Sequence, residues 1–327
     1  MSDFGLVFVL YRPTAAFLDN LRKAQALCRH VVAVDNSPAA DRALHERLRQ
    51  VDGTTVLFNR NRGGLAGAYN RGAELLLSRG CEVIFLLDQD SEIEASFFDG
   101  MLRACASLGT ESFLVGPKIH EINLGRCMPA IPPGRRFPRP RRIDDIDDGL
   151  FPTLFVISSG SALSAAAYRR LGAFREDYFI EYVDIEYGLR ASSRGVPVYM
   201  NAAVTMRQTT GHIVRHGRLF TTHHPAWRRY YGARNAVHAL GLYRDRWRLH
   251  WISGPLALHQ AFCVLLFEPD KRRKLAAIAT GYLDGLRGRL GAFEDRHPRI
   301  AAYCKGPARN GTDAAGRPSA AVGQDAP

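Results

Sequence analysis

The sequence predicts an α/β fold: a Rossmann-like, mostly parallel sheet flanked by helices and followed by a C-terminal helical extension. Three observations support this prediction. Short apolar runs alternate with helical patterns through the first half of the 327-residue chain, as in βαβ units around a parallel sheet. Polar clusters follow the apolar runs. From about residue 225 onward, the pattern is helical and basic.

The apolar runs are the predicted strands, and the segments between or after them are the predicted helices. Each run is short and apolar, as expected of a strand buried on both faces. In chain order, strands are expected at 6–10, 31–34, 54–58 and 83–87, and helices at 15–28, 41–50, 65–78 and 95–108. Later in the chain we expect a loop at 129–149, a strand at 153–157, a helix at 184–193 and a strand at 196–200.

These elements suggest three parts of the chain. Residues 1–224 form the α/β domain, and residues 225–305 form the helical extension. Residues 306–327 are rich in Gly, Ala, Pro and Asp, a composition that favours a disordered tail.

The net charge indicates which kinds of partner suit this protein, and the cysteine content indicates the redox compartment in which it works. A formal net charge of +12 suits anionic partners, namely nucleic acid, a nucleotide-bearing donor or an anionic membrane face. The six cysteines are scattered with no C-x-x-C pair, which argues against a disulfide framework or a zinc site and fits a reducing cytosol. The N-terminus enters an apolar run directly, so no secretory signal is expected.

Four polar clusters lie at the carboxyl ends of the predicted strands. Ligands of parallel α/β sheets bind beyond those ends, so the four clusters are expected to converge on one crevice. They are Tyr11-Arg12, Asp35-Asn36-Ser37, Asn59–Gly64 and Asp88–Asp90.

The Asp88-Gln89-Asp90 sequence is the most informative of these clusters. Carboxylates two residues apart at the end of a strand face the same side. Buried charges need a partner, and hard divalent cations prefer oxygen ligands while keeping positions open for phosphates. The pattern therefore predicts a clamp for a metal ion and a diphosphate, although a D-x-D by itself is also a common solvated turn.

A glycine-rich helix entry follows the third predicted strand, at residues 59–72. Glycines permit close approach of the backbone, and helix N-termini favour anions, although such a segment can also be a simple βα loop. Asp35 is a candidate for hydrogen bonds to a base or a ribose; its alternative role is an ordinary Asx turn.

A second acidic group opens the predicted helix at 184–193. Asp184 and Glu186 can act there as helix-capping carboxylates. Alternatively, Asp184 is a general base near the metal, with Arg190 one turn later to orient carboxylates or bind phosphate.

The order of these motifs resembles family 2 glycosyltransferases, and is most similar to bacterial rhamnosyltransferases of O-antigen and cell-wall polysaccharide assembly. The resemblance covers roughly residues 5–292. It implies a GT-A fold, a nucleotide-sugar donor, a divalent cation (Mg²⁺ or Mn²⁺) and an inverting single displacement. The motifs are 61–70, Asp88–Ser91, Ser158–Gly160, Phe179–Arg190 and Gly281–Gly288.

Carried over to this sequence, the resemblance assigns each candidate a role. Asp184 would be the catalytic base. Asp90 would ligate the metal, with Asp88 beside it. The nucleotide-sugar site would comprise Tyr11, Asp35, Asn61, Gly63, Asn70 and Asp88. The acceptor side would comprise Ser159, Gly160, Glu181 and Arg190.

The chain departs from the family after its last strand, where relatives often place a metal-binding His in a His-x-x-Gly setting. Here residues 208–211 read Gln-Thr-Thr-Gly. His212 is the first candidate substitute. Otherwise His216, His223 or His224 replaces it, or the metal has carboxylate and phosphate ligands alone.

The segment Trp251–Phe267 is apolar but interrupted, and is short for the roughly 20 apolar residues of a membrane span. It is either a core-packing helix or an interfacial helix on an anionic membrane, helped by the basic residues Lys271–Lys274. The enzyme is accordingly expected to be cytoplasmic and peripheral on the inner face of the cell membrane.

The expected function is transfer of rhamnose from dTDP-rhamnose to a glycan on a polyprenyl diphosphate. A UDP-dependent galactofuranosyl or hexosyl transferase is the alternative within the enzyme class. A basic nucleic-acid-binding module would explain the charge but not Asp88, Asp90 and Asp184, so no nucleic-acid partner is expected. A catalytically inactive scaffold fits these acids poorly as well, and a homodimer stays open.

Overall fold

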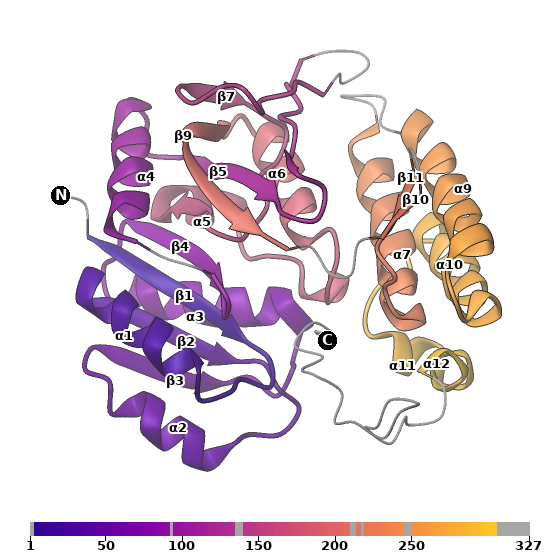
Figure 1. The fold of residues 1–327 in the computed structure, drawn as a ribbon, viewed down its shortest axis with the longest axis horizontal. Coiled ribbons are helices and arrows are strands. Elements are labelled where there is room, and N and C mark those ends of the chain that lie inside the picture. Colours follow the sequence, from indigo (N-terminus) through magenta and orange to yellow (C-terminus); the bar gives the residue numbers. More distant parts are fainter. Residues whose placement is uncertain are drawn as a thin grey trace. The chain divides into compact units, whose positions relative to one another are not determined.

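The computed structural model describes residues 3–91, 94–134, 140–209, 214–216, 219–244 and 250–305. The chain divides into two compact units, Met1–Thr209 with Tyr243–Arg248 and Thr210–Leu242 with Leu249–Pro327 (Figure 1). The domain boundary predicted at 224/225 stays a prediction, because a division of this kind does not show that either part folds alone. The tail expected at 306–327 lies outside the described residues.

Four parallel strands form one half of the main sheet, in the order β3-β2-β1-β4. The predicted strands and helices of this half are confirmed, with small shifts at their ends. The strands are β1 (Phe4–Leu10), β2 (His30–Asp35), β3 (Thr54–Phe58) and β4 (Val83–Asp88), and the helices are α1 (Phe17–Leu27), α2 (Arg42–Arg49), α3 (Gly64–Ser78) and α4 (Ala95–Ser107).

The register of these strands brings their polar carboxyl ends together. Leu10 of β1 lies opposite Asp35 of β2, which lies opposite Phe58 of β3. On the other side of β1, Val9 lies opposite Asp88 of β4. The residues that follow each strand therefore meet at one edge of the sheet (Figure 1).

The other half of the sheet is mixed, in the order β4-β8-β5-β9-β7. β8 runs antiparallel to both β4 and β5, whereas β5 and β9 are parallel. The remaining elements of this unit are β5 (Leu114–Glu121), β6 (Arg126–Cys127), β7 (Leu150–Pro152), β8 (Ala162–Ser164), α5 (Ala165–Leu171), the 3₁₀ turn η1 (Glu176–Tyr178), α6 (Val183–Ser193) and β9 (Val198–Gln208).

The strand predicted at 153–157 is wrong. The backbone there is irregular, and its polar groups bond to loops and to a neighbouring strand end: Thr153 N–H donates to Val198 O (2.9 Å) and Leu154 N–H to Ile131 O (2.8 Å). Gly188 of α6 packs against Phe155, where a Cβ atom would meet the Phe155 Cα at 2.5 Å. The segment is apolar because it is buried under α6, not because it pairs in the sheet.

The loop predicted at 129–149 is partly organised in its described portion. Ala130 and Arg141 form an isolated antiparallel bridge, and Ala130 and Ile143 pack with Met200 in a small apolar cluster. Residues 135–139 lie outside the described residues. Apolar anchors thus hold both arms of this segment against β9.

The core of the first unit forms where strand side chains meet α1 and α4. The side chains of β1 from Leu6 to Leu10 are buried, as expected for a central strand covered on both faces. Phe85 of β4 makes edge-to-face contacts with Phe4 and Phe98 at centroid distances of 5.7 and 5.1 Å. This packing fixes β4 and, with it, the D-x-D at its end.

The second unit is mainly helical. Gly281 and Gly285 let α10 approach α7 closely, since Cβ atoms at these glycines would meet Tyr230 O at 2.3 Å and Arg234 O at 2.5 Å. No helix among the described residues is long and apolar enough to cross a membrane. The elements are β10 (Val214–His216), β11 (Leu219–Thr221), α7 (Ala226–Leu242), α9 (His250–Phe267), α10 (Lys271–Leu286), α11 (Phe293–Arg296) and α12 (Pro298–Lys305).

Candidate active site

Side-chain amides join the strand ends at the predicted crevice. Asn59 Nδ2 donates to Asn36 Oδ1 (2.8 Å), and Asn36 Nδ2 donates to Asn61 Oδ1 (3.1 Å). On the β1 side, the Tyr11 N–H donates to Gln89 Oε1 (3.0 Å), within the D-x-D turn. The Arg12 N–H donates to Ser37 Oγ (2.7 Å). Hydrogen bonds therefore join all four predicted polar clusters along this edge of the sheet, as the sequence analysis expected.

Asp35 is held inside this edge. Its Oδ1 accepts from the Ser37 N–H (2.9 Å) and hydroxyl (2.5 Å), and its Oδ2 lies 2.6 Å from His45 Nε2. Both Asp35 and His45 are buried. Both carboxylate oxygens already have protein partners, so a contact with a nucleotide base would require one of them to be released.

The glycine-rich entry of α3 serves a close backbone contact. Gly63 and Gly64 have φ of 64° and 59°, in the left-handed region that favours glycine. A Cβ at Gly64 would lie 2.1 Å from Phe179 O, and the Leu65 N–H donates to that same oxygen (2.7 Å). The start of α3 is thereby fastened to the segment that leads into Asp184.

Asn70 has a structural role that the sequence analysis did not foresee. Its Nδ2 donates to Phe174 O (3.0 Å) and Glu176 Oε1 (2.9 Å), and its Oδ1 accepts from the Phe174 N–H (2.8 Å). The side chain is buried. Asn70 therefore joins α3 to the segment before Asp184 and presents no open contact to a nucleotide.

Hydrogen bonds with Asn20 and Ser91 hold the D-x-D turn in place. The Asp88 N–H donates to Ser91 Oγ (3.0 Å), and Asn20 Nδ2 donates to the carbonyl oxygens of Gln89 (3.2 Å) and Ser91 (2.9 Å). Asp88 is half-buried and Asp90 is exposed. Two carboxylates on a fixed turn are oxygen donors of the kind that hard divalent cations take.

Asp184 opens α6 after strained backbone. Glu181 and Tyr182 have φ of 60° and 61°, which costs of order 1–3 kcal/mol per residue and is typical of functional sites. The Asp184 Oδ2 accepts from the Ser158 N–H (3.1 Å), and its Oδ1 accepts from the Ile185 N–H (2.8 Å). Burial raises the pKa of the Asp184 carboxyl, and these two N–H donors lower it in part.

Tyr69 and Ser158 link the two acidic groups. The Tyr69 hydroxyl donates to Ser158 Oγ (2.9 Å). Burial raises the pKa of Tyr69 well above its usual value, and the negative charges of Asp88 and Asp184 raise it further. The D-x-D and Asp184 therefore act electrostatically on the same buried phenol. The only sequence signals for this pair were their places in the glycine-rich and Ser-Ser-Gly motifs.

Ser159 and Gly160 pass behind the site. Ser159 is buried, with its Oγ 3.5 Å from Met206 Sδ. Gly160 has φ 74°, and a Cβ there would meet Met206 at 2.7 Å and Phe97 at 3.0 Å. The positive φ favours glycine, and a larger residue would also push Met206 and Phe97 aside. The Ser159 hydroxyl is not presented to an acceptor in this conformation.

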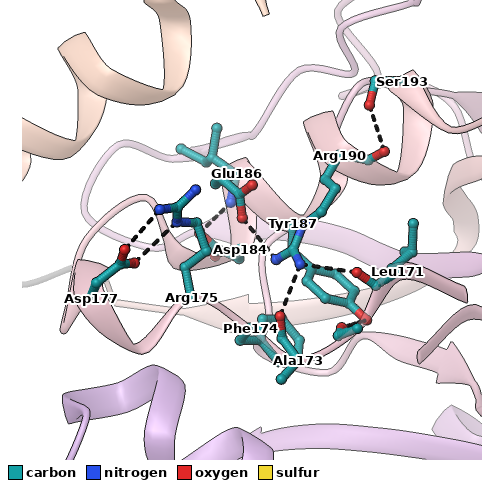
Figure 2. A network of polar contacts seen from close by, with 12 residues as sticks. Leu171, Ala173, Phe174, Arg175, Asp177, Asp184, Glu186, Tyr187, Arg190 and Ser193 are labelled. Carbon is teal, nitrogen blue, oxygen red and sulfur yellow. Dashed lines mark hydrogen bonds and ion pairs between the residues drawn. The ribbon is translucent and has the colours of Figure 1, made fainter. Parts of the chain in front are cut away.

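Glu186 and Arg190 form a fixed internal pair (Figure 2). Glu186 is buried and accepts from Arg190 Nη2 (2.9 Å) and from the Tyr243 hydroxyl (2.8 Å). Arg190 Nη1 also donates to the carbonyl oxygens of Leu171 (3.1 Å) and Ala173 (2.9 Å). The structure commits Arg190 to holding α6, and thus Asp184, instead of leaving its guanidinium open to an acceptor.

The metal-binding histidine is not located. Gln208 ends β9, and its Oε1 is buried with no hydrogen-bond partner among the described residues. His212 lies outside the described residues, and the side chain of His216 is likewise not described. His223 and His224 belong to the second unit. The identity of this ligand stays a prediction.

Comparison with known proteins agrees with the family resemblance. The model of Glycosyl transferase family 2 matches residues 14–172. Over 294 residues the chain is 26% identical to the dTDP-rhamnosyl transferase RfbF of Shigella flexneri, covering 89% of this chain and 97% of that protein.

Solved structures share the fold at low sequence identity. GalNAc-T7, solved with UDP, GalNAc and Mn²⁺, superposes with a TM-score of 0.55 at 12% identity, over 91% of this chain and 57% of that one. TarS 1–349 of S. aureus in complex with UDP-GlcNAc superposes with a TM-score of 0.53 at 13% identity, over 87% of this chain and 81% of that one. The predicted GT-A fold is thereby confirmed. Residues 14–172 match Glycosyl transferase family 2, and the chain as a whole is similar to a dTDP-rhamnosyl transferase.

Proposed function

We propose that this glycosyltransferase moves a rhamnosyl residue from dTDP-rhamnose to a lipid-linked glycan, with inversion at the anomeric carbon. The observation that carries the proposal is the way Asp184 is held: the Ser158 N–H donates to Asp184 Oδ2 (3.1 Å), and the Tyr69 hydroxyl of the glycine-rich motif donates to Ser158 Oγ (2.9 Å). The choice of donor rests on the likeness to a dTDP-rhamnosyl transferase along 89% of the chain.

Asp184 is the proposed general base. Its carboxylate takes the proton of an acceptor hydroxyl as that oxygen bonds to the anomeric carbon. The bond from that carbon to the diphosphate breaks in the same step, so the configuration inverts. A raised pKa suits this task, since a base works best when its pKa lies near the operating pH. Ser158 and Ile185 hold the carboxylate in place through their N–H groups.

Asp90 and Asp88 are the proposed ligands of a divalent cation. When bound, the cation would stabilise the negative charge of the leaving diphosphate. Support comes from the fixed turn that carries these carboxylates and from the structure of GalNAc-T7, which was solved with UDP and Mn²⁺.

Asn61 and Tyr11 lie at the same edge of the sheet, and we place them in the proposed nucleotide-sugar site. Glu181, half-buried before α6, is the remaining candidate on the acceptor side.

A donor screen tests this function. The purified enzyme is incubated with single nucleotide sugars and Mg²⁺ or Mn²⁺, and the released nucleoside diphosphate is measured with and without a lipid-linked acceptor. We expect release from dTDP-rhamnose above the other donors. Preference for a UDP-sugar would replace the donor assignment with the alternative that the UDP-GlcNAc complex of TarS suggests. Release from no donor would contradict the enzymatic proposal.

We also propose that α9 rests on the cytosolic face of an anionic membrane, where a lipid-linked acceptor would be found. Leu258, Phe262, Leu265 and Leu266 are 73%, 52%, 52% and 49% exposed, and their spacing places them on one helix face. The basic residues after α9 divide into two kinds. Lys271 and Arg272 are exposed, whereas Lys274 is buried and bonds to Glu268 Oε2 (2.9 Å).

The double variant Lys271→Glu/Arg272→Glu should bind anionic vesicles less tightly. Each basic residue near such a surface contributes about 1 kcal/mol, so removing two should weaken binding by roughly 30-fold at low salt, and added salt should reduce the difference. Cosedimentation measures this. Phe262→Glu should also weaken vesicle binding, because it removes an apolar side chain from the proposed membrane contact.

The matched control is Arg42→Glu/Arg47→Glu on the exposed side of α2. Equal weakening by this pair would mean that binding follows net charge alone and would remove α9 from the interface. A protein that ignores anionic vesicles at low salt would contradict the membrane proposal and leave internal packing or an oligomer interface as the role of α9. A dimer that dissociates on Phe262→Glu would assign the apolar face to a second copy of the chain.

A further inference from the structure

Three metal-ligating side chains meet at the edge of the sheet opposite the candidate active site. Asp3 precedes β1, His30 begins β2 and Cys81 lies two residues before β4. Because these strands are parallel neighbours, their amino ends lie at one edge. The ligand atoms of the three side chains all lie within 4.8 Å of one another, the one such trio of His, Cys, Asp and Glu groups found among the described residues.

We infer that this trio is a binding site for a borderline transition-metal ion of the zinc class. A thiolate, an imidazole and a carboxylate are the ligand types that Zn²⁺ takes, and three protein ligands with water in the fourth position form a complete tetrahedral set. The D-x-D differs from this site in chemistry, because its oxygen-only donors suit Mg²⁺ or Mn²⁺. The two sites lie at opposite ends of β4.

The distances are close to those of a bound ion. With zinc–ligand bonds of about 2.0–2.3 Å, the ligand atoms of a tetrahedral site lie roughly 3.3–3.7 Å apart. His30 Nε2 and Asp3 Oδ2 are 3.7 Å apart already. The remaining approach is about 1 Å, within reach of small side-chain rotations. Asp3 is exposed and provides an entry route.

The surroundings make room for the Cys81 sulfur. Gly5, on β1, has no side chain, and a Cβ there would lie 2.6 Å from Leu76 Cδ2 and 3.1 Å from Cys81 Sγ, so the glycine leaves room for both side chains. Cys28 is a neighbour with its own partners, since its Sγ donates to Phe4 O (3.2 Å) and His30 O (3.4 Å). Cys81 is therefore the expected sulfur ligand, and Cys28 supplies a matched thiol beside it.

Ligation must displace a proton from Cys81. Burial and the charge of Asp3 raise the pKa of this thiol to about 11, and Arg79 lowers it slightly. The thiol is protonated at neutral pH, so binding of the ion releases that proton. By joining the starts of three strands, the ion should also raise the melting temperature.

The test uses Co²⁺ as a spectroscopic substitute for Zn²⁺ on the untagged, full-length protein with excess Mg²⁺ present, which occupies oxygen-only sites. We expect a sulfur-to-cobalt charge-transfer band in the near ultraviolet and d–d bands of tetrahedral intensity, both displaced by Zn²⁺. Circular dichroism and the melting temperature without metal check that each variant folds.

Cys81→Ser should abolish the charge-transfer band, whereas Cys28→Ser and the distant Cys105→Ser should retain it. Asp3→Asn should weaken Co²⁺ binding about tenfold or more while keeping the band at high Co²⁺. The inference is overturned if the wild-type protein gives no such band, or if the band survives Cys81→Ser. These readouts do not depend on sugar transfer, so their failure leaves the proposed function untouched.

Discussion

The Asp184→Asn enzyme should bind its nucleotide-sugar donor normally and transfer sugar roughly 10²–10⁴ times more slowly. The amide keeps the shape of the side chain, and its one carbonyl oxygen can accept from either the Ser158 or the Ile185 N–H group. It cannot take a proton from the acceptor. The expected loss is the usual contribution of a positioned general base. Donor calorimetry and initial transfer rates, measured on the same preparations, separate the two effects.

The pH dependence of transfer should follow the same carboxyl group. Because burial raises the pKa of Asp184 above that of an ordinary aspartate, the base becomes protonated at a higher pH than usual. Wild-type activity should therefore fall on the acid side as the pH drops through that raised pKa. The residual activity of Asp184→Asn should lack this limb.

The same substitution should not destabilise the fold near neutral pH. A carboxyl group whose folded pKa is raised contributes stability below its unfolded pKa, and this contribution is lost as the pH rises through the folded value. Above that window the half-buried, ionised Asp184 costs stability, which the neutral amide avoids. The amide also loses one of the two hydrogen bonds to the Ser158 and Ile185 N–H groups, which offsets this gain. The Asn variant should therefore melt near the wild-type temperature, as measured by calorimetry at pH 7–8.

The matched control for Asp184 is Asp177→Asn. Asp177 lies in η1 of the same segment and pairs with Arg175 at 2.7 Å, away from the Ser158–Tyr69 contact. The Asp177→Asn variant should transfer sugar at a near-normal rate. Normal transfer by Asp184→Asn would remove that residue from the base role and would make Glu181 the next candidate, since Glu186 is bonded internally.

Binding of dTDP or UDP should depend on a divalent cation and on Asp90. In Asp90→Ala the affinity measured with Mg²⁺ or Mn²⁺ should fall by roughly 100-fold or more, because even outer-shell changes at metal sites cost 10–100-fold and Asp90 is the proposed direct ligand. EDTA should weaken binding to the wild-type protein to a similar degree. Titration calorimetry with and without metal measures both effects.

Asp19→Ala provides the control, because Asp19 is an exposed carboxylate on α1 that pairs with Arg22 at 3.1 Å. It should leave metal-dependent binding unchanged. If Asp90→Ala binds as tightly as wild type, or if EDTA changes nothing, the D-x-D is a turn and not a clamp. The hydrogen bonds that Asn20 donates to the turn, and that Ser91 Oγ accepts from the Asp88 N–H, would then explain its place at the end of β4.

Much of the first unit could be predicted because its signals are local. β1 to β4 are short apolar runs between amphipathic helices, and their length and composition show in any window of the sequence. The mixed half of the sheet was harder. β8 has only three residues and pairs with β4 and β5, so its position depends on partners far along the chain. The apolar segment 153–157 was mistaken for a strand because burial under a helix leaves the same composition.

The sequence by itself determined the α/β architecture, the place of the D-x-D at a strand end and the position of Asp184 at the start of a helix. Only the tertiary structure decided which polar residues face inward. Asn70 and Arg190 match family motifs, yet Asn70 bonds to the buried Phe174 and Arg190 to the buried Glu186. The trio of Asp3, His30 and Cys81 became visible only when parallel pairing brought three distant strand starts together. The physical reason is that residue type and spacing report local conformation, whereas hydrogen-bond partners and burial depend on contacts that the fold alone creates.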